Sequence, residues 1–284
     1  NWVNLALVPA YIVRQLVVVV LMAAAWLAGA PTDAVSAVII AAISIWLTAL
    51  GQMLLLNRKL ASRVESGTKE YDIRNWIALS IPMFAVDSLY SMLMYVDVLV
   101  LKQFRSPDEI AIYYAALKTL SLVAFVYFAV SAASAHRFAE YHVAGDRARL
   151  TAFLRDVVKW TFWPSLGATL MLLACGWPML WLFGKNFVSG YHLMFIFAIG
   201  MLARASIGPA ERFLVMLGEQ RVCALIAALA FAVNLGLCLL LVPRFGIEGA
   251  AWSITTAFML ESALLFLVAK QKLGFHIFVF GSRG

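Results

Sequence analysis

Three charged side chains lie at the end of a long apolar segment, within residues 202–217. Arg204, Glu211 and Arg212 are surrounded there by residues that are mostly hydrophobic. An ionised side chain at membrane depth costs at least ~3 kcal/mol, so membrane proteins keep one only where it faces protein or water. Gly208-Pro209 falls between these charges, and a proline removes a helical hydrogen bond and frees backbone carbonyls. Charges beside a broken membrane helix favour a transport pathway over a structural core.

Arg204 and Glu211 share one face of a continuous helix to within about 20°. They are two turns apart, too far to pair directly unless the break at Gly208-Pro209 changes the geometry. Two interpretations of Arg204 follow: a buried ion pair that joins two helices, or a cationic surface on a water-filled cavity. We favour the cavity, while Arg212 fits a cavity and a position near the cytoplasmic interface equally well.

Two further cations lie within apolar segments. Arg14 falls about halfway along the first one, and Lys118 lies about two helical turns into the fourth. Long basic side chains can reach the interface from such depths, which explains both residues without a function. The alternative places them, with Arg204 and Arg212, in a set of substrate-binding cations.

Acidic residues accompany these cations. Asp87 and Asp97 lie in the third apolar segment, and Asp97 is near its outer end, where an interfacial position also explains it. A carboxylate next to cations within a membrane is a candidate site for ion or proton coupling, and equally a candidate for charge balance. Glu211 joins this group. Glu261 and Asn234, in the last two apolar segments, are interpreted as groups that hydrogen-bond between helices.

Motifs of catalysis and cofactor binding are missing from the sequence. Glycine-rich phosphate loops, His/Cys metal spacings and nucleophile elbows do not occur. We therefore expect no enzyme activity, no metal and no cofactor, and coupling to Na⁺ or H⁺ stays open. Short outer loops leave little room for a catalytic domain, which argues against a membrane glycosyltransferase or polymerase.

The elements that must position these side chains are membrane helices. The chain has 284 residues, of which 64% are hydrophobic and 13% are charged, with a mean hydropathy of +0.90. Soluble domains carry about a quarter charged residues, and a membrane span needs about 20 mostly apolar ones. The sequence predicts an all-α polytopic membrane protein with about eight transmembrane helices, at 4–29, 34–56, 75–101, 110–134, 157–183, 189–217, 221–242 and 248–270.

Lysines and arginines concentrate in alternate loops. Basic residues cluster in 57–74, in 136–159 and after residue 270, whereas the opposite loops carry few. Because cytoplasmic loops are enriched in Lys and Arg, both ends of the chain are predicted to be cytoplasmic. This asymmetry also explains most of the net charge of +7, so no nucleic acid partner is expected.

The first two and the last two predicted spans share a layout. Each pair has an outer turn with a proline, an acidic residue and an alanine, within 31–34 and 243–250. Internal repeats of this kind are common among secondary transporters. The predicted organisation is therefore two closing helices of a first lobe, a cytoplasmic linker, a complete six-helix lobe and a cytoplasmic tail, at 1–56, 57–74, 75–273 and 274–284.

Several segments of the chain form a recognisable pattern. They begin with Ser80-Ile-Pro82 through Asp97-Val-Leu-Val-Leu, followed by Ser106 to Ala116, and continue with Arg204 to Gly218 and Asn234-Leu-Gly-Leu. Leu241-Val-Pro-Arg-Phe-Gly-Ile-Glu-Gly-Ala-Ala251 is the most recognisable piece. Together these segments resemble polysaccharide flippases of the multidrug/oligosaccharidyl-lipid/polysaccharide exporter superfamily, while Ala111 stands where the family often has glycine.

The resemblance covers nearly the whole chain and implies a function. The family usually has twelve to fourteen spans in two six-helix lobes, so the chain is expected to be a fragment that lacks the first spans. Such proteins move undecaprenyl-pyrophosphate-linked oligosaccharide across the bacterial inner membrane by alternating access, and work beside glycan polymerase and ligase machinery. A cationic cavity suits pyrophosphate because arginine presents forked donors to phosphate oxygens. The nearest alternative is a cation-coupled multidrug antiporter of the same superfamily, and a non-transporting scaffold is a third.

Overall fold

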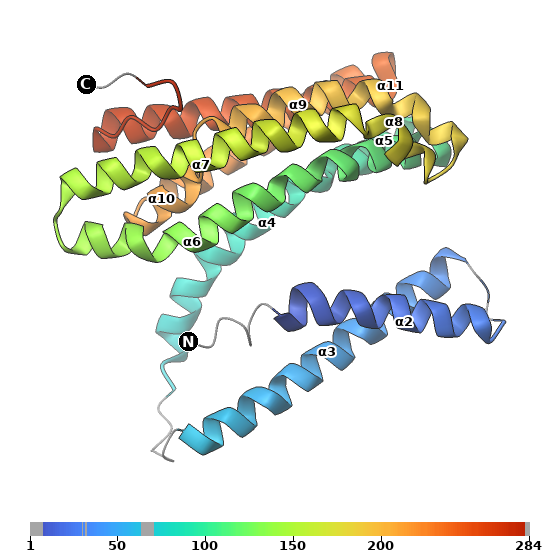
Figure 1. Ribbon diagram of the computed structural model, residues 1–284, viewed down its shortest axis with the longest axis horizontal. Helices are drawn as coiled ribbons and strands as arrows, with labels where there is room; N and C mark the ends of the chain where they lie inside the picture. The colour runs from blue at the N-terminus through green and yellow to red at the C-terminus, as the bar shows by residue number, and fades with distance from the viewer. Residues whose placement is uncertain (1–7, 30, 32, 64–70, 282–284) are drawn as a thin grey trace. The chain divides into compact units, whose positions relative to one another are not determined.

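The computed structural model describes residues 8–29, 31, 33–63 and 71–281, and a few helical side chains within these ranges, including that of Asp87, lie outside the description. The chain is 88% helical and the described residues contain no strand, which confirms the all-α class (Figure 1). The elements are η1 (Pro9–Val13), α2 (Arg14–Leu27), α3 (Ala34–Arg63), α4 (Ile73–Phe104), α5 (Pro107–Leu120), η2 (Ser121–Val123), α6 (Ala124–Val143), α7 (Arg147–Ala174), α8 (Gly176–Trp181), η3 (Lys185–Gly190), α9 (Tyr191–Ala205), α10 (Ala210–Met216) and α11 (Gln220–Leu273).

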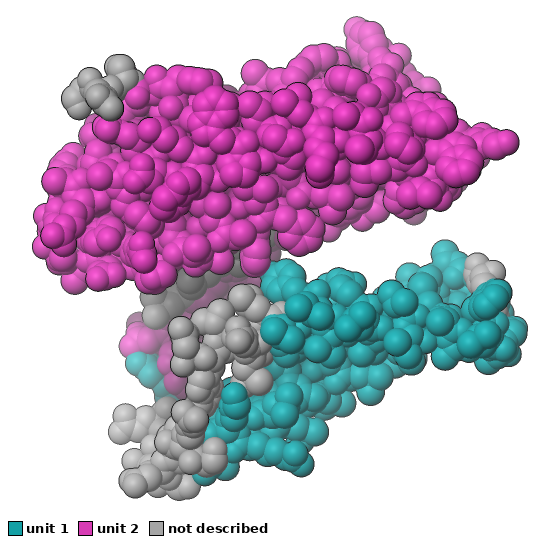
Figure 2. All heavy atoms as spheres, in the orientation of Figure 1, with its two compact units in different colours: residues 1–72 teal, residues 73–284 magenta. Residues whose placement is uncertain are grey.

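Two compact units divide the chain, residues 1–72 and residues 73–284 (Figure 2). In the first unit α2 packs against α3 as a helical hairpin. The side chain of Asp33 precedes α3, and its Oδ1 accepts a hydrogen bond of 2.8 Å from the backbone N–H of Ser36. This hydrogen bond lowers the pKa of Asp33 because it favours the carboxylate. An acidic side chain at this position satisfies one of the unpaired N–H groups that begin every helix.

Six helical segments of the described residues are long and apolar enough to cross a membrane, which confirms a polytopic membrane protein. They are Pro9–Leu27, Ala34–Ala61, Pro107–Tyr141, Arg147–Ala174, Lys185–Met216 and Gln220–Lys272. The last contains 53 residues, more than twice the length that one crossing requires. It covers both of the final two predicted spans.

A sharp turn at Gly246 separates the two arms of α11. Gly246 has φ 60° and ψ −133°, a conformation that favours glycine. A Cβ atom added at Gly249 would lie 2.6 Å from the carbonyl oxygen of Leu241. In a straight helix those two residues would be about 12 Å apart, so the arms fold back on each other here. The outer turn expected from Pro243 and the glycines is therefore present, although helical hydrogen bonding continues close to it.

A second break interrupts the predicted span 189–217. Helix α9 ends at Ala205 and α10 begins at Ala210, and Gly208 between them has φ 60°. A Cβ atom at Gly208 would lie 3.0 Å from the Cα of Val158 in α7, so only glycine fits both the backbone angle and the contact. The helical phase that aligns Arg204 with Glu211 in a continuous helix does not carry across this turn.

Two hydrophobic clusters form the core of the second unit. One lies among α4, α5, α9 and α11, and the other joins α6, α7, α10 and the end of α11. Phe275 and Ile277, which follow α11, are buried in the second cluster. The backbone N–H of Val279 donates a hydrogen bond of 3.0 Å to the carbonyl of Ser206. The segment predicted as a cytoplasmic tail is thus packed against the break between α9 and α10.

Candidate functional site

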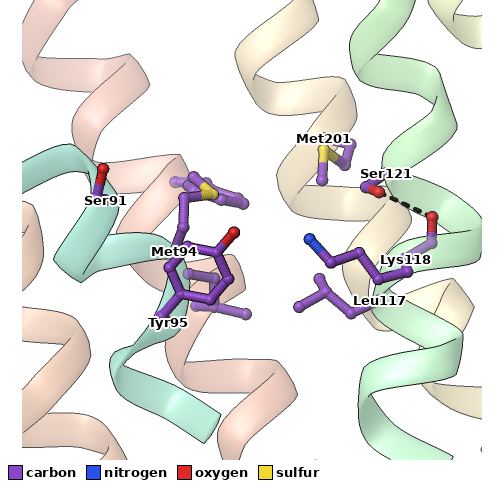
Figure 3. Close-up of a pocket in the computed structure, with 9 residues that line it drawn as sticks. Ser91, Met94, Tyr95, Leu117, Lys118, Ser121 and Met201 are labelled. Atoms are coloured by element: carbon purple, nitrogen blue, oxygen red, sulfur yellow. Dashed lines mark hydrogen bonds between the residues drawn. The ribbon is translucent and has the colours of Figure 1, made fainter. Parts of the chain in front are cut away.

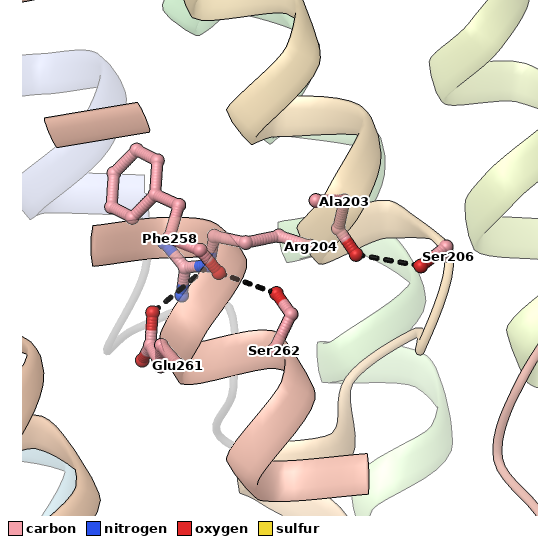
Figure 4. A network of polar contacts seen from close by, with 6 residues as sticks. All are labelled: Ala203, Arg204, Ser206, Phe258, Glu261 and Ser262. Atoms are coloured by element: carbon pink, nitrogen blue, oxygen red, sulfur yellow. Dashed lines mark hydrogen bonds and ion pairs between the residues drawn. The ribbon is translucent and has the colours of Figure 1, made fainter. Parts of the chain in front are cut away.

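Arg204, near the end of α9, forms an ion pair with Glu261 in the second arm of α11 (Figure 4). The distance from Nε of Arg204 to Oε2 of Glu261 is 3.6 Å, and the two side chains are 15% and 4% exposed. This Oε2 atom is buried and has no hydrogen-bond partner. Both residues lie about 20 Å along their helices from the ends at Tyr191 and Ile247, and a hydrocarbon core is about 30 Å thick. The ion pair therefore lies at membrane depth.

Two aromatic rings hold the guanidinium of Arg204. Its Cζ atom lies 5.0 Å from the ring centroid of Phe258 and 5.7 Å from that of Tyr127. Each such contact contributes about 0.5–2 kcal/mol, depending on exposure. Arg204 also lines a cavity of about 60 Å³. The lining residues are Val123, Ala124, Tyr127, Ser165, Met201, Arg204 and Ala205.

Lys118 lies on α5, whose first turn is fixed by a capping box between Ser106 and Glu109. The Nζ atom of Lys118 is 5.5 Å from the ring centroid of Tyr95 and 5.1 Å from that of Tyr114. It faces a cavity of about 300 Å³ among α4, α5, α9 and α11 (Figure 3). The lining residues are Ser91, Met94, Tyr95, Leu117, Lys118, Ser121, Met201, Ile254 and Phe258.

Met201 and Phe258 connect the two cationic positions. Met201 lines both cavities, and Phe258 lines the larger one while its ring contacts Arg204. On their helices, Met201 precedes Arg204 and Phe258 precedes Glu261 by a single turn, which puts each pair on one helix face. Lys118 and Arg204 are thus in neighbouring cavities separated by two apolar side chains.

The buried acids of the second unit have protein partners. Asp97 is 0% exposed, and its carboxylate accepts hydrogen bonds from the hydroxyl of Tyr113 in α5 and from the backbone N–H of Val98. This complete burial means that Asp97 faces protein, whatever its depth in the membrane. Glu261 pairs with Arg204, and the amide of Asn234 donates a hydrogen bond of 3.2 Å from α11 to the carbonyl of Leu93 in α4. Asn234 hydrogen-bonds between two helices, as expected from the sequence, whereas Glu261 joins two helices through an ion pair.

The remaining predicted site residues are not among those that line the two described cavities. Arg14 begins α2 in the first unit, so its place with Arg204 in one set of substrate-binding cations stays a prediction. Arg212 is exposed and Glu211 is half-buried, both on α10, beyond the break that follows α9. The side chain of Asp87 lies outside the described residues. Lys118 and Arg204 are the two predicted cations that line the described cavities.

Three residues of this region were missed by the sequence interpretation. Tyr113 binds Asp97, Tyr127 contacts Arg204, and Ser165 lines the smaller cavity. Ser165 follows Pro164 in the middle of α7, and a polar residue next to a proline in an apolar span is a usable signal. The two tyrosines carry no comparable signal, because aromatic residues are frequent throughout the chain.

Long apolar helices with a buried ion pair between two of them, and with two cavities lined by cations, define a polytopic α-helical membrane protein with a polar interior. The MatE family profile matches residues 82–240, more than half of the chain. The chain therefore belongs to the MatE family, whose members are transporters of the multidrug/oligosaccharidyl-lipid/polysaccharide exporter superfamily. Neither the curated proteins nor the solved structures that were compared with the chain contain a match.

Proposed function

We propose that this transporter, rather than being an enzyme, moves an anionic lipid-linked oligosaccharide, carried on undecaprenyl pyrophosphate, across the bacterial inner membrane. The observation that carries the proposal is the charge of the cavities. Lys118 is the one charged side chain among the nine described residues that line the larger cavity, and Arg204 is the one among the seven that line the smaller. Lysine and arginine side chains bind phosphate oxygens through short, charge-assisted hydrogen bonds.

The alternative is a cation-coupled multidrug antiporter of the same superfamily. A site for cationic drugs needs a carboxylate that faces the cavity, because an unpaired cation is costly to bury. Among the side chains that the structure describes in the second unit, the buried acids are Asp97, which pairs with Tyr113, and Glu261, which pairs with Arg204. This arrangement favours an anionic substrate. Alternating access, Na⁺ or H⁺ coupling, cytoplasmic chain ends and contact with glycan polymerase and ligase machinery belong to the same proposal.

Binding of a short prenyl pyrophosphate tests the proposal. Purified protein in detergent is titrated with farnesyl pyrophosphate, with farnesol and with the cationic dye ethidium, using microscale thermophoresis. Losing one charge-assisted contact of about 1.5–3 kcal/mol weakens binding roughly 10- to 100-fold. We expect this loss for Lys118→Gln and for the charge-neutral pair Arg204→Gln/Glu261→Gln.

Lys185→Gln is the matched control, because Lys185 is an exposed residue in η3 on neither cavity. Farnesyl pyrophosphate is expected to bind this variant like the unmodified protein, and farnesol to bind all variants weakly. Ethidium binding without pyrophosphate binding would refute the anionic substrate and favour the antiporter.

A further inference from the structure

Ser165 is a buried residue that lines the small cavity of Arg204. It is 1% exposed, and its Oγ atom makes no hydrogen bond to any residue that the structure describes. An unsatisfied buried hydroxyl costs about 1–3 kcal/mol, so native structures rarely keep one without an occupant that satisfies it. Thr161, on the same helix, donates to a carbonyl one turn earlier, whereas Ser131 in α6 and Thr169 in α7 are buried without a hydrogen-bond partner among the described residues, as Ser165 is. Of these three unpartnered residues, Ser165 is the one that lines a described cavity.

The cavity has room for a small oxygen-rich group. Its volume is about 60 Å³, and a water molecule takes about 30 Å³ in the liquid. Arg204 supplies a guanidinium on one side and Ser165 a hydroxyl from α7, while the remaining lining residues are apolar except for Tyr127. A guanidinium and a hydroxyl that face one space are donors for the oxygens of a phosphate group.

Glu261 holds the guanidinium loosely. The 3.6 Å separation from Nε exceeds a normal N–H···O hydrogen bond, and the carboxylate meets one edge of a group with five N–H donors. The rings of Phe258 and Tyr127 support Arg204 independently of Glu261. The carboxylate therefore neutralises Arg204 without forming the two-pronged pair that would lock it.

We propose that Ser165 and Arg204 form a subsite for one phosphate group of the substrate, and that Glu261 is the counter-charge that this phosphate displaces. This inference rests on the proposed function, and it adds Ser165 as a binding residue and Glu261 as a competitor. Ion-pair exchange keeps Arg204 neutralised both before and after the substrate binds. It also lets the transporter release its substrate, since the returning carboxylate competes for the same cation.

The subsite predicts opposite effects for two conservative substitutions. Ser165→Ala removes one hydrogen-bond donor, and its binding of farnesyl pyrophosphate is expected to weaken about 3- to 10-fold. Glu261→Gln removes the competing charge, and binding is expected to tighten about tenfold with slower dissociation. In the Arg204→Gln background the gain from Glu261→Gln disappears, because the competitor acts through Arg204.

Two exposed residues give matched controls. Ser189→Ala removes a hydroxyl that already donates to the carbonyl of Asn186, and Glu248→Gln neutralises an exposed glutamate on α11. Both are expected to bind the probe like the unmodified protein. Monodisperse elution in size-exclusion chromatography establishes that each variant is folded. Ser165→Ala removes a single oxygen, so it decides the proposal even where Glu261→Gln gives no folded protein.

The outcomes separate this inference from the function on which it rests. If Ser165→Ala changes the Kd for farnesyl pyrophosphate by less than twofold, the subsite is overturned and the proposed function is kept. Weaker or equal binding by folded Glu261→Gln overturns the competitor role in the same way. Absence of farnesyl pyrophosphate binding to the unmodified protein overturns both.

Discussion

The hydroxyl of Tyr113 is expected to stabilise the second unit through Asp97. Tyr113→Phe removes the donor and keeps the ring, whose centroid lies 5.4 Å from that of Phe197 in an edge-on contact. Both Tyr113 and Asp97 are 0% exposed, so water does not replace the lost hydrogen bond. The substitution leaves a buried carboxyl with the backbone N–H of Val98 as its remaining hydrogen-bond donor among the described residues.

The stabilising free energy expected to be lost with this hydrogen bond lies at the upper end of the values known for membrane proteins. Hydrogen bonds between membrane helices average about 0.6 kcal/mol and reach about 1.7, and bonds to charged groups in proteins contribute about 1.5–3. We therefore expect Tyr113→Phe to cost about 1.5–2 kcal/mol, because the acceptor is a carboxylate and its burial is complete. In a chain of this size 1 kcal/mol lowers Tm by about 2–4 °C, so the expected decrease is about 3–8 °C.

Thermal unfolding in detergent, followed by tryptophan fluorescence, measures this decrease. Tyr114→Phe is the matched control, since it removes a hydroxyl from the next residue of α5, where the side chain is exposed. The double variant Tyr113→Phe/Asp97→Ala removes both partners, and its loss is expected to be smaller than the sum of the single losses. A Tm within 1 °C of the unmodified protein for Tyr113→Phe, at about the precision of the method, would refute the reasoning.

Two further predictions concern the turns. Gly249→Ala forces a Cβ atom to within 2.6 Å of the carbonyl oxygen of Leu241, so the arms of α11 must separate, and we expect a loss of about 1–3 kcal/mol by thermal unfolding. Gly236→Ala meets nothing within 4 Å and is expected to be neutral or stabilising, which makes it the control. Asp33→Ala is expected to lower the Tm slightly at pH 7. Because the pKa of Asp33 is lowered from 3.8 by folding, its stabilisation is present above pH 3.8 and is lost as pH falls below that value. The two proteins should therefore have equal Tm in strong acid, and a difference that persists there would contradict the carboxylate cap.

Turn chemistry was the part of the fold that the sequence predicted best. Pro243 and the glycines after it indicated a tight turn between two spans, and the structure has that turn at Gly246 and Gly249. Gly208-Pro209 indicated a break in a membrane helix, and α9 ends three residues before it. Glycine and proline restrict backbone angles locally, so these features can be predicted without knowledge of the neighbours.

Side-chain partners could not be predicted in the same way. Asp97 and Tyr113 meet because α4 and α5 cross at a particular angle, and helical periodicity specifies a face without specifying what packs on it. For the same reason the burial of Phe275 and Ile277 could not be predicted. Both follow the last predicted span and were assigned to the tail, and both are buried. The alignment of Glu211 with Arg204 was predicted for a continuous helix, and the positive φ of Gly208 interrupts that helix, so the role of Glu211 stays a prediction.

Arg204 combines the two roles that the sequence interpretation treated as alternatives. It forms a buried ion pair between two helices, and it also lines a cavity. The roles are compatible because a guanidinium has donors on several edges and two flat faces, so one edge can meet Glu261 while the faces contact aromatic rings. An ammonium group is a compact charge without separate edges or flat faces. Lys118 has such a group, and its contacts are with the rings of Tyr95 and Tyr114. Replacing Arg204 by lysine would keep the charge and lose this division of contacts, which is why the substitution is not conservative here.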